Sequence, residues 1–414
     1  MQKRTIKDIE VKGKRVFVRV DFNVPVKGGV VTDDTRIRAA VPTIRDLAGR
    51  GAKIILASHL GRPIKERKKA EEAGKVFDSS KFSLALVFAR FNELVADIPE
   101  IKNTRFASDC IGDEVNEAAA SLADGDVLLL ENLRLHPEEE QNDSDFAKQL
   151  ASLCDIYVND AFGTAHRAHA STEGITHFVD TCVAGLLMEK ELDYLGRVLE
   201  SPERPFIAIL GGAKVSDKIP VIDSLIERKV DKLLIGGAMA YTFFKANGYT
   251  VGKSLVENDM LDRAKEIEQR ADSAGIELVL PTDHQVVDSA DPLHSLKTIP
   301  IDFTNAGHVG LDIGVETAAI FANALNGAKT IVWNGPMGMF EEKPFDQGTI
   351  AVAKAVAEAT DNGAVSIVGG GDSVAAIKQA GLEDHISHIS TGGGATLEFL
   401  AGDVLPGVAA LNDK

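Results

Sequence analysis

The amino-acid sequence predicts an α/β protein made of two doubly wound, parallel-sheet (Rossmann-like) domains that a hinge helix joins. Short runs rich in valine, isoleucine and leucine are followed by a turn and a longer amphipathic stretch, the βα unit of a sheet buried on both faces. Such units occur in both halves of the 414-residue chain. A helical pattern ending at prolines separates the two halves.

The first half contains four expected strands, at residues 16–20, 53–57, 126–130 and 155–158. Ligands of open α/β sheets bind beyond the carboxyl ends of the strands. The residues that follow each run are therefore the candidates for a binding site. They are polar and cationic: Asp21, Asn23, His59, Arg62, Arg134 and Arg167, with Arg36 in a helix expected to begin after Asp34.

An arginine side chain can grip a carboxylate or a phosphate with two parallel hydrogen bonds. Taken singly, each of these arginines could be a surface ion-pair partner. Several at corresponding strand ends, in a chain of net charge −17, predict a pocket for a small and multiply anionic molecule. Residues 65–80 form a charged stretch with little apolar content, which is typical of a solvated surface loop.

The linking helix is expected over residues 186–201, where apolar side chains recur at helical spacing before Pro202 and Pro205. It divides the chain into domains 1–185 and 202–401. Six strands are expected in the second domain, at residues 206–210, 232–235, 276–280, 330–333, 364–368 and 388–390.

Five of these second-half strands lead into glycine-rich turns, at 211–214, 236–237, 334–338, 369–373 and 391–394. Glycine lets backbone N–H groups approach an anion closely, and a following helix N-terminus favours negative charge. One such turn is weak evidence, because tight βα turns favour glycine anyway. Five of them predict a nucleotide or polyphosphate lying across this sheet edge.

Two charged features sharpen this prediction. Lys214 and Lys218 are expected on the first turn of one helix, where two cations oppose the helix dipole unless an anion lies between them. Asp372 ends a triple-glycine turn and is a candidate magnesium ligand, because this hard cation prefers oxygen. The same position also suits a helix N-cap.

Composition narrows the class of partner and compartment. A net charge of −17 argues against a broad surface for nucleic acid or an anionic membrane. The three cysteines cannot form a disulfide framework, which favours a reducing compartment. No apolar run is long enough to span a membrane, and the N-terminus lacks a secretory pattern, so a cytoplasmic location is expected.

The ordered motifs resemble the phosphoglycerate kinase family over nearly the whole chain. The strings that carry the resemblance are RVDFNVP at 19–25, SHLGRP at 58–63, ENLR at 131–134, NDAFGTAHRAH at 159–169, GGAKVSDK at 211–218, WNGPMG at 333–338, GGGD at 369–372 and STGGGA at 390–395.

This resemblance implies a monomeric, hinge-bending enzyme that transfers a phosphoryl group between ATP and the carboxylate of 3-phosphoglycerate, with Mg²⁺, in glycolysis and gluconeogenesis. It implies that domain 1–185 binds phosphoglycerate, that 202–401 binds the nucleotide, and that 402–414 packs back on the first domain. The implied phosphoglycerate site is Asp21, Asn23, Arg36, His59, Arg62, Arg134 and Arg167. The implied nucleotide site is Lys214, Lys218, Gly310, Asn334, Glu341, Gly370, Gly371, Asp372 and Ser373, with Asp372 on the metal.

We assign Arg36 and Lys214 to the transferring phosphoryl group, one from each domain. The nucleophile is a carboxylate that is already ionised, so no general base is needed. His308 and Val315 depart from the family pattern on either side of Gly310, which makes the nucleotide preference an open question. Two alternatives stay open: a kinase for another carboxylate, and a non-catalytic two-lobed solute-binding protein.

Overall fold

The computed structural model describes residues 2–289, 291 and 295–414. Its backbone contacts divide the chain into two compact units, one comprising Met1–Asp193 with Val404–Lys414 and the other Tyr194–Asp403. Each unit is built on a six-stranded parallel sheet. This arrangement confirms the predicted fold class.

The sheet of the first unit has the strand order β5-β6-β4-β1-β7-β8, and every neighbouring pair is parallel. Because β1 lies between β4 and β7, the chain winds first to one side of β1 and then to the other, so their carboxyl ends meet at the switch point. The strands are β1 (Arg15–Val20), β4 (Lys53–Ala57), β5 (Thr104–Phe106), β6 (Val127–Leu129), β7 (Ile156–Asp160) and β8 (Cys182–Ala184).

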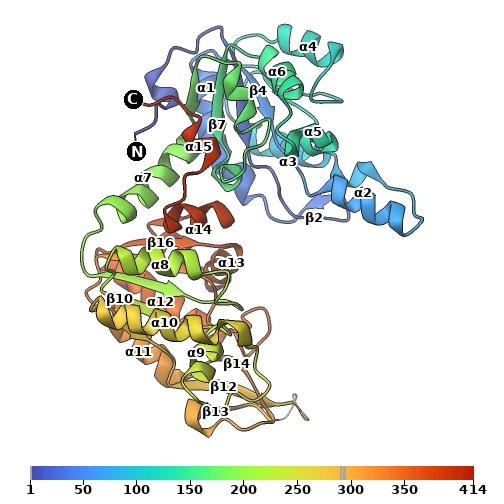
Figure 1. The fold of residues 1–414 in the computed structure, drawn as a ribbon. Coiled ribbons are helices and arrows are strands. Elements are labelled where there is room, and N and C mark those ends of the chain that lie inside the picture. The colour runs from blue at the N-terminus through green and yellow to red at the C-terminus, as the bar shows by residue number, and fades with distance from the viewer. Residues whose placement is uncertain (1, 290, 292–294) are drawn as a thin grey trace. The chain divides into compact units, whose positions relative to one another are not determined.

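Helices cover this sheet (Figure 1). Buried side chains of α1 and α3, such as Ile44 and Phe91, form one core cluster with β1, β4 and β6. The helices of the unit are α1 (Thr35–Gly49), α2 (Pro63–Glu72), α3 (Ala85–Val95), α4 (Asp113–Ala120), α5 (Pro137–Glu140), α6 (Ser144–Ser152) and α15 (Pro406–Ala409). A short hairpin, β2 (Val26–Lys27) with β3 (Val30–Val31), precedes α1.

The second sheet has the order β11-β10-β9-β15-β16-β17, again with parallel neighbours. All six strands expected in this half are present: β9 (Phe206–Leu210), β10 (Lys232–Ile235), β11 (Glu277–Val279), β15 (Thr330–Asn334), β16 (Val365–Gly369) and β17 (His388–Ile389). Its helices are α8 (Ile219–Glu227), α9 (Ala240–Ala246), α10 (Leu261–Ser273), α11 (Val315–Leu325), α12 (Gln347–Asp361), α13 (Gly371–Ala380) and α14 (Gly394–Ala401).

Several strands were not predicted. β5 and β8 are three-residue strands at the two edges of the first sheet, and β5 has no buried residue. The second unit adds an antiparallel sheet of β13 (Lys297–Pro300), β12 (Asp283–Asp288) and β14 (His308–Ile313). Short or mixed-polarity segments like these carry no apolar run, so the pattern that identified the central strands could not find them.

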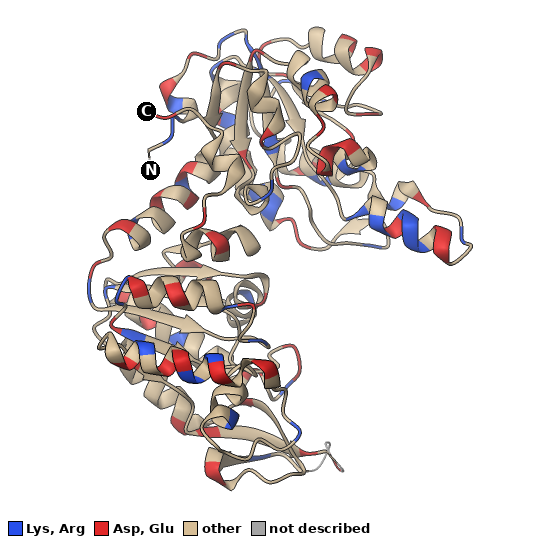
Figure 2. Cartoon of the chain, viewed as in Figure 1, with Lys and Arg blue, Asp and Glu red and all other residues tan. Residues whose placement is uncertain are grey.

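The loop predicted at 65–80 is wrong in its first half, because α2 occupies Pro63–Glu72. Pro63 starts the helix, where its missing N–H costs nothing, and lysine, arginine, glutamate and alanine are good helix formers. Lys69 pairs with Glu66 at 2.7 Å. Only Pro63 of this helix is buried, and the ribbon of α2 in Figure 2 is coloured mostly as basic and acidic positions.

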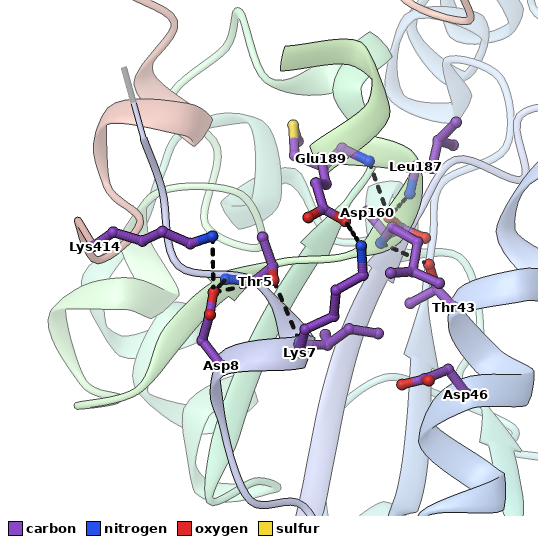
Figure 3. A network of polar contacts seen from close by, with 12 residues as sticks. Thr5, Lys7, Asp8, Thr43, Asp46, Asp160, Leu187, Glu189 and Lys414 are labelled. Atoms are coloured by element: carbon purple, nitrogen blue, oxygen red, sulfur yellow. Dashed lines mark hydrogen bonds and ion pairs between the residues drawn. The ribbon is translucent and has the colours of Figure 1, made fainter. Parts of the chain in front are cut away.

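Helix α7 (Leu186–Glu200) begins in the first unit, where its first backbone N–H groups are all accepted (Figure 3). The Leu186 N–H donates to Thr43 Oγ1 (3.0 Å), and those of Leu187 and Met188 donate to Asp160 Oδ1 (2.9 and 3.2 Å). Burial raises the pKa of the Asp160 carboxyl to about 7, although hydrogen bonds from Thr43 and these amides act in the opposite direction. Asp160 at the end of β7 therefore fixes where α7 starts.

The described helices include none that is both long and apolar enough to cross a membrane.

We expect Gly185→Ala to destabilise the protein by about 1–3 kcal/mol in urea unfolding. A Cβ at Gly185 would lie 2.2 Å from Oδ1 and 2.7 Å from Cβ of the buried Asp160, so the cap would have to move. Gly196→Ala is the matched control in α7, because its Cβ meets nothing within 4 Å. The free energy of unfolding of Gly196→Ala should rise by roughly 0.5–1 kcal/mol. Equal effects of the two substitutions would contradict this account.

Asp160→Asn should flatten the pH dependence of stability. The native pKa of Asp160 lies above its unfolded value, so the native state binds a proton that the unfolded state lacks between about pH 4 and 7. Stability falls as pH rises through this window, by up to about 1.4 kcal/mol per pH unit. Asparagine keeps the Oδ1 acceptor and cannot ionise. The melting temperature of Asp160→Asn should therefore rise relative to that of wild type between pH 5 and pH 8.

Asp155→Asn is the control for this experiment. Arg15 holds the pKa of Asp155 below its usual range, so its titration is complete below this window. The difference in melting temperature between Asp155→Asn and wild type should stay constant from pH 5 to pH 8. If the melting temperatures of Asp160→Asn and wild type changed in parallel with pH, the proposed role of Asp160 would be disproved.

Candidate functional site

Residues beyond the carboxyl ends of β1, β4, β6 and β7 form a cationic cluster in the first unit. Arg36, on the first turn of α1, reaches back to the segment after β1. Its Nη1 lies 3.3 Å from Asp21 Oδ2 and donates to the carbonyl oxygen of Asn23 (2.8 Å). Asn23 Oδ1 in turn accepts from the Gly61 N–H after β4 (2.9 Å). These contacts connect two adjacent strand ends.

Arg134 follows β6 and is almost fully buried. Its Nη1 donates to the Gly61 carbonyl (3.1 Å), and its Nε lies 3.4 Å from Glu140 Oε1. Its buried Nε and Nη2 have no hydrogen-bond partner among the described residues. The pKa of this guanidinium is lowered to about 10, mainly by burial and also by the charges of Arg19 and Arg167, while Glu140 acts in the opposite direction. Unsatisfied donors of this kind call for an anionic acceptor.

His59 is buried beside Arg19, whose Nη2 donates to Nδ1 of the imidazole (3.1 Å). Burial holds the pKa of His59 well below its usual range, and Arg134 and Arg19 lower it further. His59 is therefore neutral at physiological pH, and its other ring nitrogen carries the proton that can be donated. The site obtains its positive charge from arginines and uses this histidine as a neutral hydrogen-bond donor.

Arg167 lies in the loop after β7, and its Nε donates to His166 Nε2 (3.0 Å). The C-terminal segment supports this loop within the same unit: the Gly407 N–H donates to the Ala165 carbonyl (2.8 Å), and Asn159 Nδ2 donates to the Gly407 carbonyl (3.0 Å). The chain end thus packs behind the loop that carries Arg167.

Four of the seven residues expected in this site are joined by the contacts above, directly or through Gly61: Asp21, Asn23, Arg36 and Arg134. His59 contacts Arg19 instead. Arg167 is an electrostatic neighbour of Arg134, whereas Arg62 is exposed at the N-cap of α2.

Sequence reasoning did not assign Arg19, His166 or His169 to this site. Arg19 is fully buried within β1, and its Nε donates to Ser171 Oγ (2.8 Å). A charged residue inside an otherwise apolar strand is the signal that could have identified it. Burial, together with the charges of Arg134 and Arg19, lowers the pKa of His169 to about 3, so this imidazole is neutral as well.

The second unit contains a cavity of about 430 Å³ at the carboxyl ends of its strands. Four of the five predicted glycine turns supply lining residues, including Gly212, Gly237, Gly338 and Asp372. The turn at 391–394 is described and supplies none. A Cβ at Gly237 would lie 2.6 Å from the Gly212 nitrogen, so only glycine permits this approach of two strand-end turns.

The other wall of this cavity includes Gly310 and Glu341, as predicted, together with Tyr241 and His284. The Tyr241 hydroxyl lies 2.8 Å from His284 Nδ1, and a Cβ at Gly310 would lie 1.8 Å from that hydroxyl. His308 is buried against Asn305 and Val315 is exposed on α11. Neither residue is among those that line the cavity.

The predicted helical position of Lys214 and Lys218 is wrong. Lys218 is the N-cap of α8, and residues 214–217 lie in the turns before it. Pro220 explains the late start, because proline lacks an N–H and is tolerated only in the first helical turn. Lys218 Nζ makes a short hydrogen bond to Asn334 Oδ1. Burial lowers the pKa of Lys218, while the charges of Asp217 and Asp372 raise it.

Asn334 and Ser373 hold the next turn of this site. Asn334 Nδ2 donates to the Gly369 carbonyl (2.9 Å), and the Gly335 N–H donates to Ser373 Oγ (2.6 Å). Gly370, with a positive φ of 92°, is the N-cap of α13, and a Cβ there would lie 2.9 Å from Asn334 Nδ2. The expected nucleotide residues Lys218, Asn334, Gly370 and Ser373 therefore form one connected group, and Gly371 begins the helix.

Asp372 is the second residue of α13 and does not serve as its N-cap. It is exposed and lines the cavity, at the helix end where phosphates bind well. Mg²⁺ commonly takes one or two protein carboxylates and completes its shell with phosphate and water oxygens. The accessible carboxylate of Asp372 beside the glycine turns fits a magnesium–nucleotide complex.

Comparisons with known proteins agree along the whole chain. A family model described as Phosphoglycerate kinase matches residues 6–403. Phosphoglycerate kinases of Chlorobium luteolum and Chlorobium chlorochromatii are 56% and 57% identical to this chain over 413 and 416 residues, covering 100% of both sequences in each case.

Solved structures give the same result. The structure of phosphoglycerate kinase from Coxiella burnetii has a TM-score of 0.83 at 39% identity, covering 99% of this chain and 98% of that one. The enzyme from Pyrococcus horikoshii has a TM-score of 0.81 at 34% identity, with the same coverage.

Proposed function

This chain belongs to the phosphoglycerate kinase family and catalyses phosphoryl transfer between ATP and 3-phosphoglycerate, a step of glycolysis; from this premise we propose how its residues divide the work. The cationic cluster of the first unit binds phosphoglycerate, and the glycine-lined cavity of the second binds the nucleotide. The observation that carries this assignment is the buried guanidinium of Arg134, whose Nη2 has no hydrogen-bond partner among the described residues.

On the acid side, Arg134, Arg167 and Arg62 bind the phosphate and His59 donates a neutral hydrogen bond. Asp21 and the Asn23 carbonyl orient Arg36, which leaves the rest of its guanidinium for the reacting carboxylate and the phosphoryl group. The carboxylate attacks the terminal phosphorus of ATP, and the bond from that phosphorus to the ADP oxygen breaks. No proton is transferred in this step.

On the nucleotide side, Lys218 and the turn at Gly370–Ser373 bind phosphates, and Gly310 and Glu341 line the nucleoside end. Asn334 orients Lys218. Lys214 meets the migrating phosphoryl group opposite Arg36, where two cations offset the charge that spreads over its equatorial oxygens. Asp372 holds Mg²⁺, which neutralises part of the phosphate charge.

Arg36→Ala tests the first of these roles in an assay with ATP and 3-phosphoglycerate. We expect kcat to fall on the order of a thousandfold or more, by analogy with an arginine finger, with little change in KM for ATP. Arg38→Ala is the control on the same helix, because Arg38 is exposed and pairs only locally with Asp34 (2.9 Å). An unchanged kcat for Arg36→Ala, with an unaltered melting curve, would refute the role.

We further propose that the enzyme works as a cytoplasmic monomer whose two units approach when both substrates are bound. The two sites belong to different units, and in-line transfer needs reacting atoms in contact. Approach of the units also excludes water, which would hydrolyse the acyl phosphate.

Small-angle scattering tests this approach. The radius of gyration should drop with 3-phosphoglycerate and a non-hydrolysable ATP analogue together, and change little with either alone. The scattering at zero angle should give the mass of one chain. Full compaction with the nucleotide alone would contradict the requirement for both substrates.

A further inference from the structure

Three side chains of metal-ligand type converge beyond β5, at the edge of the first sheet. Asp109, Cys110 and His136 each offer one ligand atom, and these atoms lie within 4.8 Å of one another. Among residues 2–289, 291 and 295–414, no other group of three or more His, Cys, Asp or Glu side chains brings its ligand atoms this close together. None of the three takes part in the phosphoryl transfer derived above.

The backbone on both sides of this group is held in place. Asp109 and Cys110 lie in the loop before α4, where the Glu131 N–H donates to the Asp109 carbonyl (3.3 Å). His136 is the N-cap of α5, and its ring packs on Phe146 with centroids 5.4 Å apart. The ring is thus oriented so that its Nε2 lies 2.7 Å from Asp109 Oδ1.

We propose that Asp109, Cys110 and His136 form a binding site for a zinc-type transition-metal ion. A thiolate, an imidazole and a carboxylate are the donors that such ions prefer, whereas Mg²⁺ and Ca²⁺ prefer oxygen alone. Three protein ligands with a water in the fourth position make a tetrahedral site. Binding forms a metal–sulfur bond and releases the Cys110 thiol proton to solvent, and His136 binds as neutral imidazole.

The exposure of the three residues suits such a site. Cys110 is fully buried, so its sulfur forms the floor, while the side chains of His136 and Asp109 are 27% and 49% exposed and provide the entry. Without metal, the same contacts make Asp109 a hydrogen-bond partner of the imidazole and of the Cys110 N–H (2.7 Å).

The position of the site relative to the cationic cluster gives the proposal a consequence. His136 lies two residues after Arg134, and α5, which it caps, carries Glu140, the ion-pair partner of Arg134. A metal that holds His136 therefore binds next to the segment that positions Arg134. The metal site itself does not depend on the function proposed above, and its test uses no activity measurement.

Titration of the intact protein with Co²⁺ alone tests the proposal. Cobalt in a tetrahedral site with a thiolate ligand gives strong visible bands and a sulfur-to-cobalt charge-transfer band, which oxygen-only sites such as the one at Asp372 do not give. We expect both features at one cobalt per chain, and their loss on adding Zn²⁺, which binds such sites more tightly. Absence of the charge-transfer band in wild type would overturn the proposal.

Variants assign the ligands. Cys110→Ser should lose the charge-transfer band, and His136→Gln and Asp109→Asn should weaken Co²⁺ binding roughly tenfold or more. His136 and Asp109 are partly exposed, so their variants test the site even if Cys110→Ser unfolds. Persistence of the band in Cys110→Ser, or unchanged affinity in His136→Gln, would overturn the assignment.

Matched controls come from the same unit. Cys182→Ser removes another buried cysteine, and His177→Gln removes a histidine that pairs with Glu173 at 2.6 Å. Both should keep the cobalt spectrum of wild type. Loss of the band in Cys182→Ser would place the cobalt elsewhere and disprove the site.

Discussion

The concentration of positive charge at the carboxyl edge of the first sheet is the constraint on which the rest of this protein depends. The chain has a net charge of −17, yet Arg19 and Arg134 are both buried and close enough for Arg19 to lower the pKa of Arg134. Burying a guanidinium is costly unless its donors are satisfied. The protein meets this demand only in part, through Ser171, backbone carbonyls and Glu140, and Nη2 of Arg134 has no hydrogen-bond partner among the described residues.

The histidines beside these arginines stay neutral near physiological pH. His59 and His169 have lowered pKa values because they are buried among arginines, so protonation near neutral pH does not change the charge of the site. The second unit is built differently. It brings glycine turns together so closely that a Cβ at Gly237 would meet backbone, and it places the partly buried Lys218 within the electrostatic influence of Asp372.

Asp160 and the C-terminal segment both contact elements next to the cationic cluster of the first unit. Asp160 ends the strand that leads to the Arg167 loop and also accepts the first amides of α7, the helix that continues into the second unit. Gly407 packs against Ala165 in the same loop. The start of the linking helix, the end of the chain and the loop that carries Arg167 thus share one strand end.

The sequence by itself determined the fold class and all the central strands, because buried parallel strands are continuous apolar runs. It also predicted candidate site residues at the carboxyl ends of these strands, where ligands of open α/β sheets bind. Only the tertiary structure decided the edge strands β5 and β8, the helix at Pro63–Glu72, and the turn before α8 that holds Lys214. It alone revealed Arg19 as part of the cluster and brought Cys110 to His136. Short edges, exposed helices and contacts between distant segments depend on neighbours in space, which no local pattern records.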